Sequence, residues 1–91
     1  MKLLNSKPNS VTQEVIDDII KNSEKEVFHA VFGKQCIVVL LLPNGFTVVG
    51  ESGCVDPDNY DKKIGERIAM QKITEQIWML EGYKLQNELN L

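Results

Sequence analysis

Apolar residues recur at helical spacing near both ends of the chain and form nearly continuous runs in between. Ser10-Val11-Thr12-Gln13 fits the capping-box pattern, which predicts a helix over about residues 11–24 with Ser10 as its N-cap. Asp56-Pro57 predicts the start of a second, long helix, because Asp is a favoured N-cap and Pro lacks only an N–H that would be unpaired there. This helix is expected to reach about Glu81, where Gly82 kinks or ends it, with a further turn or two beyond. Its expected core-facing stripe is Tyr60, Ile64, Ile68, Ala69, Ile73, Ile77 and Leu80.

The middle of the chain carries the signal of a β-hairpin. The runs 36–42 and 46–52 are rich in β-branched residues and flank Pro43-Asn44-Gly45. Asn-Gly predicts a type I′ turn with Asn44 and Gly45 as the two loop residues. In that register Leu40 faces Val49, Val38 faces Glu51 and Cys36 faces Gly53. Pro43 then ends the first strand, which indicates a sheet edge at that point.

Both faces of this hairpin are apolar, so cover on both sides is expected. Two helices cover one face well and the other only in part, and self-association is the economical way to cover the rest. Val27–Phe32 is a short strand or an extended lead-in, and as a strand it would make the sheet three-stranded. The predicted class is α+β in the order α-β-β-α, with a flexible arm at residues 1–9 and a single domain at residues 10–91.

Composition narrows the partners. Ten Lys and Arg against thirteen Asp and Glu give a net charge of −3, which disfavours direct binding of nucleic acid. No apolar run is long enough for a signal peptide or a bilayer span, so we expect no membrane association and a cytoplasmic location. The two thiols, Cys36 and Cys54, lack metal-ligand spacing, so we expect no metal and no cofactor. We expect both thiols to be structural. The predicted hairpin register also places Cys36 and Cys54 near each other, so a disulfide between them is the alternative.

The most suggestive polar segment is Gly50–Cys54, where a strand gives way to the loop before a helix. Backbone N–H groups at such a turn, with the positive end of the helix nearby, are suited to an anion such as phosphate. The candidate ligand-binding residues are Glu51, Ser52 and Gly53, with Lys34 and Arg67 as charge partners. A glycine-permitted bend with no ligand is the alternative. Gly65, in the middle of the long helix, indicates close approach of another backbone or of a ligand.

The hairpin and the long helix carry a family resemblance over about residues 37–85. Its motifs are Asn44-Gly45-Phe46, Gly50-Glu51-Ser52, Cys54-Val55-Asp56-Pro57, Ile64-Gly65, Ile77-Trp78 and Leu80-Glu81-Gly82-Tyr83. The sequence resembles the small bacteriophage proteins named after gene product forty-nine of phage N-four and gene product sixty-six of phage Sf-six. The resemblance implies a phage origin and action in the host bacterial cytoplasm, and it supplies no catalytic residues. Proline is common in relatives at the position of Met79. The resemblance therefore does not decide whether the long helix is interrupted near Trp78.

Three functions compete. The leading hypothesis is a non-enzymatic phage accessory protein, a homodimer or higher oligomer, that antagonises host defence by sequestering a nucleotide-like anion. The alternative is an acidic inhibitor of a host protein such as a nuclease or defence effector, using Asp56, Asp58 and Asp61 and the pair Asp17-Asp18. A minimal hydrolase built on Cys54 and His29 is the third.

Overall fold

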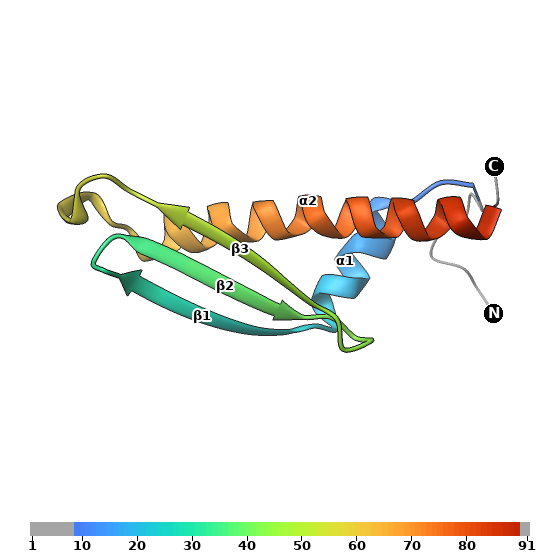
Figure 1. Cartoon of the computed structure of the whole chain (residues 1–91), viewed down its shortest axis with the longest axis horizontal. Helices are drawn as coiled ribbons and strands as arrows, with labels where there is room; N and C mark the ends of the chain where they lie inside the picture. Colours follow the sequence, from blue (N-terminus) through green and yellow to red (C-terminus); the bar gives the residue numbers. More distant parts are fainter. Residues whose placement is uncertain (1–8, 90–91) are drawn as a thin grey trace.

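The computed structural model describes residues 9–89 and shows one three-stranded sheet with a long helix on one side (Figure 1). The elements in chain order are α1 (Gln13–Lys21), β1 (Glu24–Val31), β2 (Gln35–Leu41), β3 (Thr47–Gly53), a 3₁₀ turn η1 (Pro57–Asn59) and α2 (Lys62–Leu89). The α+β class is confirmed, and the order is α-β-β-β-α, with the segment around Val27–Phe32 forming a strand. The predicted arm falls outside the described residues except for Asn9.

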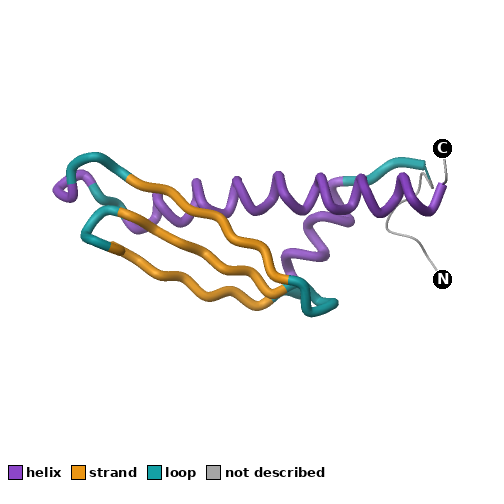
Figure 2. The backbone as a smooth tube through the Cα atoms, in the orientation of Figure 1, coloured by secondary structure: helices purple, strands orange, loops and turns teal. Residues whose placement is uncertain are grey.

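The sheet is antiparallel in the order β1-β2-β3, so β2 is its central strand. α2 packs mainly on β3, then on β2, and touches β1 at few points, while α1 packs beside α2 where that helix runs past the sheet (Figures 1 and 2). The buried core is therefore a single layer between α2, α1 and one sheet face. It consists of Ile16, Cys36, Val38, Leu40, Leu42, Val48, Ala69, Ile73 and Ile77. Within residues 9–89 no helix combines the length and apolar content needed to cross a bilayer.

The hairpin forms as predicted, but its register is shifted by one residue. Leu42 O accepts from Gly45 N, and Phe46 O accepts from Leu42 N, so the loop has three residues. Gly45 has a φ of +94°, whereas Asn44 is not among the residues with positive φ, which rules out the type I′ turn. Pro43 lies inside this loop and marks no sheet edge. A three-residue loop with its last residue left-handed is the next commonest hairpin connection.

This shift decides which side chains are buried. Leu40 pairs with Val48, Val38 with Gly50 and Cys36 with Ser52, in place of the predicted partners Val49, Glu51 and Gly53. Because side chains alternate along a strand, a slip of one residue moves every side chain of β3 to the other face. The face against α2 therefore carries Val48, Gly50 and Ser52, and Glu51 lies on the opposite face.

The helix boundaries also differ from the predicted ones. α1 begins two residues later than predicted and ends at Lys21; Thr12 rather than Ser10 is the N-cap, and its hydroxyl accepts from Val15 N at 3.4 Å. Asp56 and Pro57 start only the short turn η1, and Asp61 caps α2 through hydrogen bonds from the N–H groups of Lys63 and Ile64. α2 then continues without a break through Gly82 to Leu89.

The buried seam of α2 is made of small and medium residues. Gly65, Ala69, Ile73 and Ile77 are buried, whereas Ile64, which the pattern placed in the core stripe, is 46% exposed. At Gly50 the helix backbone lies directly on β3. A Cβ added there would overlap the carbonyl oxygen of Ala69 and would come within 2.8 Å of Ile73 Cγ1. The separation between α2 and β3 is therefore set by the absence of a side chain at residue 50.

We predict that Gly50→Ala lowers the free energy of unfolding by about 2 kcal/mol or more, because the backbone of α2 must move away from the sheet. Gly53→Ala is the matched control, since its nearest neighbour, Lys34 O, would lie at 3.7 Å. We expect that control to change stability by no more than about 0.5 kcal/mol. Urea unfolding followed by circular dichroism measures both. Equal losses in the two variants would contradict the close approach.

Candidate functional site

Two of the five predicted ligand-binding residues line a small cavity at the start of α2. The cavity has a volume of about 80 Å³ and is lined by Ser52, Gly53, Cys54, Asn59, Tyr60, Asp61, Ile64, Gly65 and Ile68. Ser52 is only 6% exposed, and its hydroxyl donates to Gly65 O at 2.7 Å. The close approach expected at Gly65 is thus an approach of Cys36 and Ser52 side chains, whose nearest atoms would lie 3.2 and 3.3 Å from an added Cβ.

The helix start beside this cavity has few donors to offer an anion. The Asp61 carboxylate accepts from Lys63 N at 2.9 Å and from Ile64 N at 3.0 Å, and Asp61 O accepts from Gly65 N. An internal carboxylate therefore already occupies the position that a bound phosphate would take. Anion binding at this point stays a prediction, and the geometry gives it no free cluster of N–H groups.

The other three predicted residues lie apart from the cavity. Lys34 is in the turn before β2, where its carbonyl accepts from Cys54 N at 3.0 Å. Glu51 lies 3.4 Å from Lys72 Nζ and also accepts from Gln35 at 3.4 Å. Arg67 lies on α2 and lines different hollows from those that hold Ser52 and Gly53. The structure therefore brings Ser52 and Gly53 together and separates them from Arg67.

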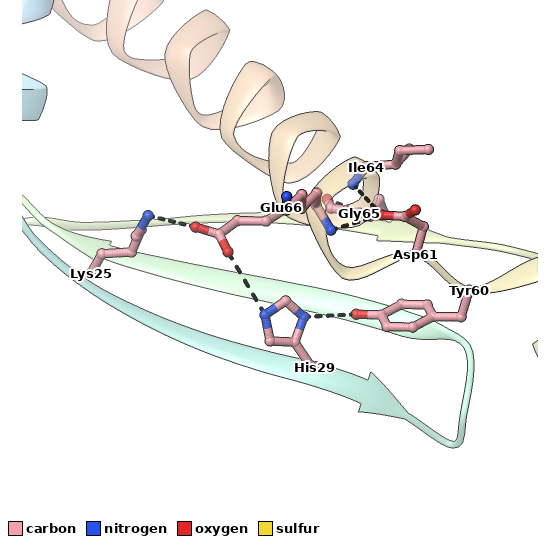
Figure 3. Close-up of polar contacts among 9 residues, drawn as sticks. Lys25, His29, Tyr60, Asp61, Ile64, Gly65 and Glu66 are labelled. Carbon is pink, nitrogen blue, oxygen red and sulfur yellow. Dashed lines mark hydrogen bonds and ion pairs between the residues drawn. The ribbon is translucent and has the colours of Figure 1, made fainter.

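A polar cluster that the sequence reasoning missed lies between α2 and β1 (Figure 3). Lys25 Nζ contacts Glu66 Oε2 at 2.6 Å, and His29 Nε2 lies 3.7 Å from Glu66 Oε1. On the other side of its ring, His29 Nδ1 is 2.9 Å from the hydroxyl of Tyr60. Strand β1 thus supplies Lys25 and His29, α2 supplies Glu66, and the loop between η1 and α2 supplies Tyr60.

Two of these groups have shifted pKa values. The hydrogen bond from Lys25 lowers the pKa of the Glu66 carboxyl, and the charge of Lys25 acts in the same direction. Partial burial raises the pKa of the Tyr60 phenol. Glu66 is therefore ionised and Tyr60 protonated at neutral pH, so the phenol keeps a proton that it can donate to Nδ1 of His29.

Glu66 also borders a hollow in the α2 surface that continues this cluster. The hollow measures about 340 Å³ and is lined by Lys63, Glu66, Arg67 and Met70. A neighbouring hollow shares Arg67 and Met70 and adds Gln71, Thr74 and Glu75. We call the cluster and the first hollow together the α2–β1 site. Lys63 and Arg67 line this hollow beside Glu66, and the Glu66 carboxylate is itself paired with Lys25, in a chain whose net charge is −3.

The thiols form no catalytic arrangement in the described part of the chain. Both cysteines are free, Cys36 is buried, and Cys54 Sγ contacts the carbonyl oxygens of Lys34 and Asp56. The contacts of His29 are to Tyr60 and Glu66, so it is not paired with Cys54. Among residues 9–89 no group of three His, Cys, Asp or Glu side chains is placed to hold a metal ion.

The comparisons with known proteins agree with the motifs of the hairpin and of α2. A family model described as "Phage protein (N4 Gp49/phage Sf6 gene 66) family" matches residues 11–89. The chain belongs to this family. The resemblance stated from the motifs is thereby confirmed, and the match extends it over α1 and β1. No significant match was found among curated proteins or among solved structures.

We predict that Lys25→Met raises the pKa of Glu66 toward its ordinary value, because the main group that lowers it is removed. A depressed carboxyl pKa stabilises the folded state above the unfolded-state value and loses that effect as the pH falls through the folded-state value. Wild type should therefore lose more stability than Lys25→Met between neutral and acidic pH. Carboxyl NMR titration measures the pKa, with Lys72→Met as the control, since Lys72 contacts Glu51. An unchanged Glu66 pKa in Lys25→Met would contradict the assignment.

We predict a structural role for Ser52. Ser52→Ala should lower the free energy of unfolding by about 1 kcal/mol, the usual net worth of one intramolecular hydrogen bond. Thermal and urea unfolding measure this loss. A fully stable variant would show that the bond to Gly65 O does not contribute to the packing of α2.

Proposed function

We propose that this phage protein is a non-enzymatic accessory protein of the host cytoplasm that antagonises host defence by sequestering a small, nucleotide-like anion. The observation that carries the proposal is that Lys63 and Arg67 share one hollow of α2 with Glu66, whose carboxylate is paired with Lys25. Of the residues predicted from sequence, only Arg67 belongs to this site. The proposal therefore moves the ligand from the Ser52 cavity to the α2–β1 site.

The chemistry of the α2–β1 site fits a phosphate-bearing ligand. Arg presents a planar fork of donors that matches two phosphate oxygens, and Lys adds a mobile positive charge. Met70 offers a polarisable apolar surface on which part of a base can rest. The hollow of about 340 Å³ is open to solvent on the surface of α2, so it contacts one side of such a ligand.

The site is shallow, which bears on the oligomeric state. Tight small-molecule sites enclose most of the ligand surface, and a hollow on one side of a helix leaves much of the ligand in water. We therefore include self-association in the proposal. A second copy that covers the ligand would complete the site, and ligand binding would then favour the dimer by mass action.

We predict that Arg67→Gln weakens nucleotide binding about tenfold or more, the usual effect of removing one charge-assisted hydrogen bond. Isothermal titration calorimetry with a panel of linear and cyclic nucleotides, together with pyrophosphate, measures the affinity. Lys72→Gln is the matched control, because it removes a cation from the same helix where α2 faces β3 and Glu51.

Lys63→Gln should act in the same direction as Arg67→Gln, and rising salt should weaken binding in the wild type. Light scattering with and without the bound nucleotide reports whether the ligand joins two copies. No heat with any member of the panel, or equal losses in Arg67→Gln and Lys72→Gln, would refute the proposal.

A further inference from the structure

The sheet has a second face that no part of residues 9–89 covers. Because α2 packs on the face that carries Val38, Leu40 and Val48, the alternate residues of the strands point the other way. Several of these are large and apolar, and Phe28 and Val49 are both 49% exposed. We call this surface the open face. Its outward residues are Glu24, Glu26 and Phe28 of β1, Gln35, Ile37, Val39 and Leu41 of β2, and Thr47, Val49 and Glu51 of β3.

The charge on the open face has one sign. Glu24 and Glu26 flank the apolar centre on the β1 side, and Glu51 flanks it on the β3 side. The three strands contain one Lys and no Arg, and that residue, Lys25, reaches Glu66 on the covered side. The open face is thus an apolar strip with an acidic rim, and it lies on the side of the sheet opposite the α2–β1 site.

We infer that the open face is a docking surface for a host protein that presents apolar side chains flanked by Lys and Arg. Protein interfaces commonly have an apolar centre and a polar rim, and complementary rim charges select the partner and speed its association. The acidic partner-binding surface lies here rather than at Asp56 and Asp61, since those carboxylates cap η1 and α2. The inference does not depend on the ligand proposed for the α2–β1 site.

A second copy of the chain fits this face less well. Stacking two open faces would bring two sets of Glu24, Glu26 and Glu51 into one interface without a cation on either strand surface to pair with them. Only Glu51 has a compensating neighbour, Lys72, at 3.4 Å. Like charges brought together at an interface cost several kcal/mol. A partner with a basic rim meets the same carboxylates with attraction.

The size of the apolar strip also favours a partner that contacts the rim. From strand spacing and rise per residue, the strip covers roughly 250 Å². A stable interface buries about 800 Å² on each side, so the contact must extend over the carboxylates around the strip. The rim charges would then lie inside the interface, where they affect affinity strongly.

Site-specific photo-crosslinking tests the inference. A photo-reactive residue is placed at position 49 on the open face and, in a control protein, at position 79, where Met79 is 69% exposed on α2. Each full-length protein is expressed in the host bacterium and irradiated, and the adducts are mapped by mass spectrometry. We expect an adduct at position 49 to a host protein, through a segment that contains Lys or Arg beside apolar residues, and at least about tenfold more of it than at position 79.

Charge reversal supplies the second measurement. Glu24→Lys with Glu26→Lys should reduce the position-49 adduct about tenfold or more, whereas Glu75→Lys with Glu88→Lys makes the same charge change on α2 and should leave it within about twofold. Circular dichroism confirms that each variant is folded. An adduct to a second copy, no adduct above the position-79 level, or an adduct unaffected by Glu24→Lys with Glu26→Lys would each overturn the inference. Nucleotide titration of the same variants measures ligand binding at the α2–β1 site independently. Failure of one proposal can therefore be distinguished from failure of the other.

Discussion

The arrangement of the molecule depends on the contact between the α2 backbone and β3 at Gly50. A side chain at residue 50 would overlap the Ala69 carbonyl, so the helix can lie this close to the strand only where the strand carries no Cβ. Ser52 holds the same region together one turn away through its bond to Gly65 O. Both contacts draw α2 toward β3 and β2 and away from β1. Lys25 and His29 of β1 reach Glu66 of α2 at the strand that the helix contacts least (Figure 3).

One helix on one side of a sheet also separates the charges of the domain. The side of the sheet that carries α2 has Lys25 paired with Glu66, and Lys63 and Arg67 in the hollow beside Glu66. The open face keeps Glu24, Glu26 and Glu51 around an apolar strip. The net charge of −3 reveals neither feature, since it is the sum over the cations of the α2–β1 site and the carboxylates of the open face. Arguments from net charge exclude an extended basic surface but say nothing of a local one of three residues.

Local signals in the sequence predicted which segments form helices and strands. The errors in hairpin register and in helix boundaries arise where two such signals compete. Asn44-Gly45 favours a two-residue loop, but Pro43 is also suited to the second position of a type I turn, and that turn with Gly45 left-handed gave the observed register. Asp56 and Asp61 both carry capping signals, and the second starts the long helix. Ile64 fits an apolar stripe, yet the seam takes the smaller residues, because Ala69 lies against Gly50 and Gly65 lies against Cys36 and Ser52. The α2–β1 site escaped prediction because Lys25 and Glu66 are 41 residues apart, beyond any local spacing rule.

The sequence predicts a hairpin that is apolar on both faces, and the observed register gives these two faces different surroundings. With β3 shifted by one residue, Val48 enters the core and Val49 moves to the open face. The core thereby becomes a single layer, and the residual apolar surface is confined to one side of the sheet. Covering that side leaves the α2–β1 site untouched, because the sheet lies between them. The geometry therefore leaves the open face and the α2–β1 site accessible at the same time.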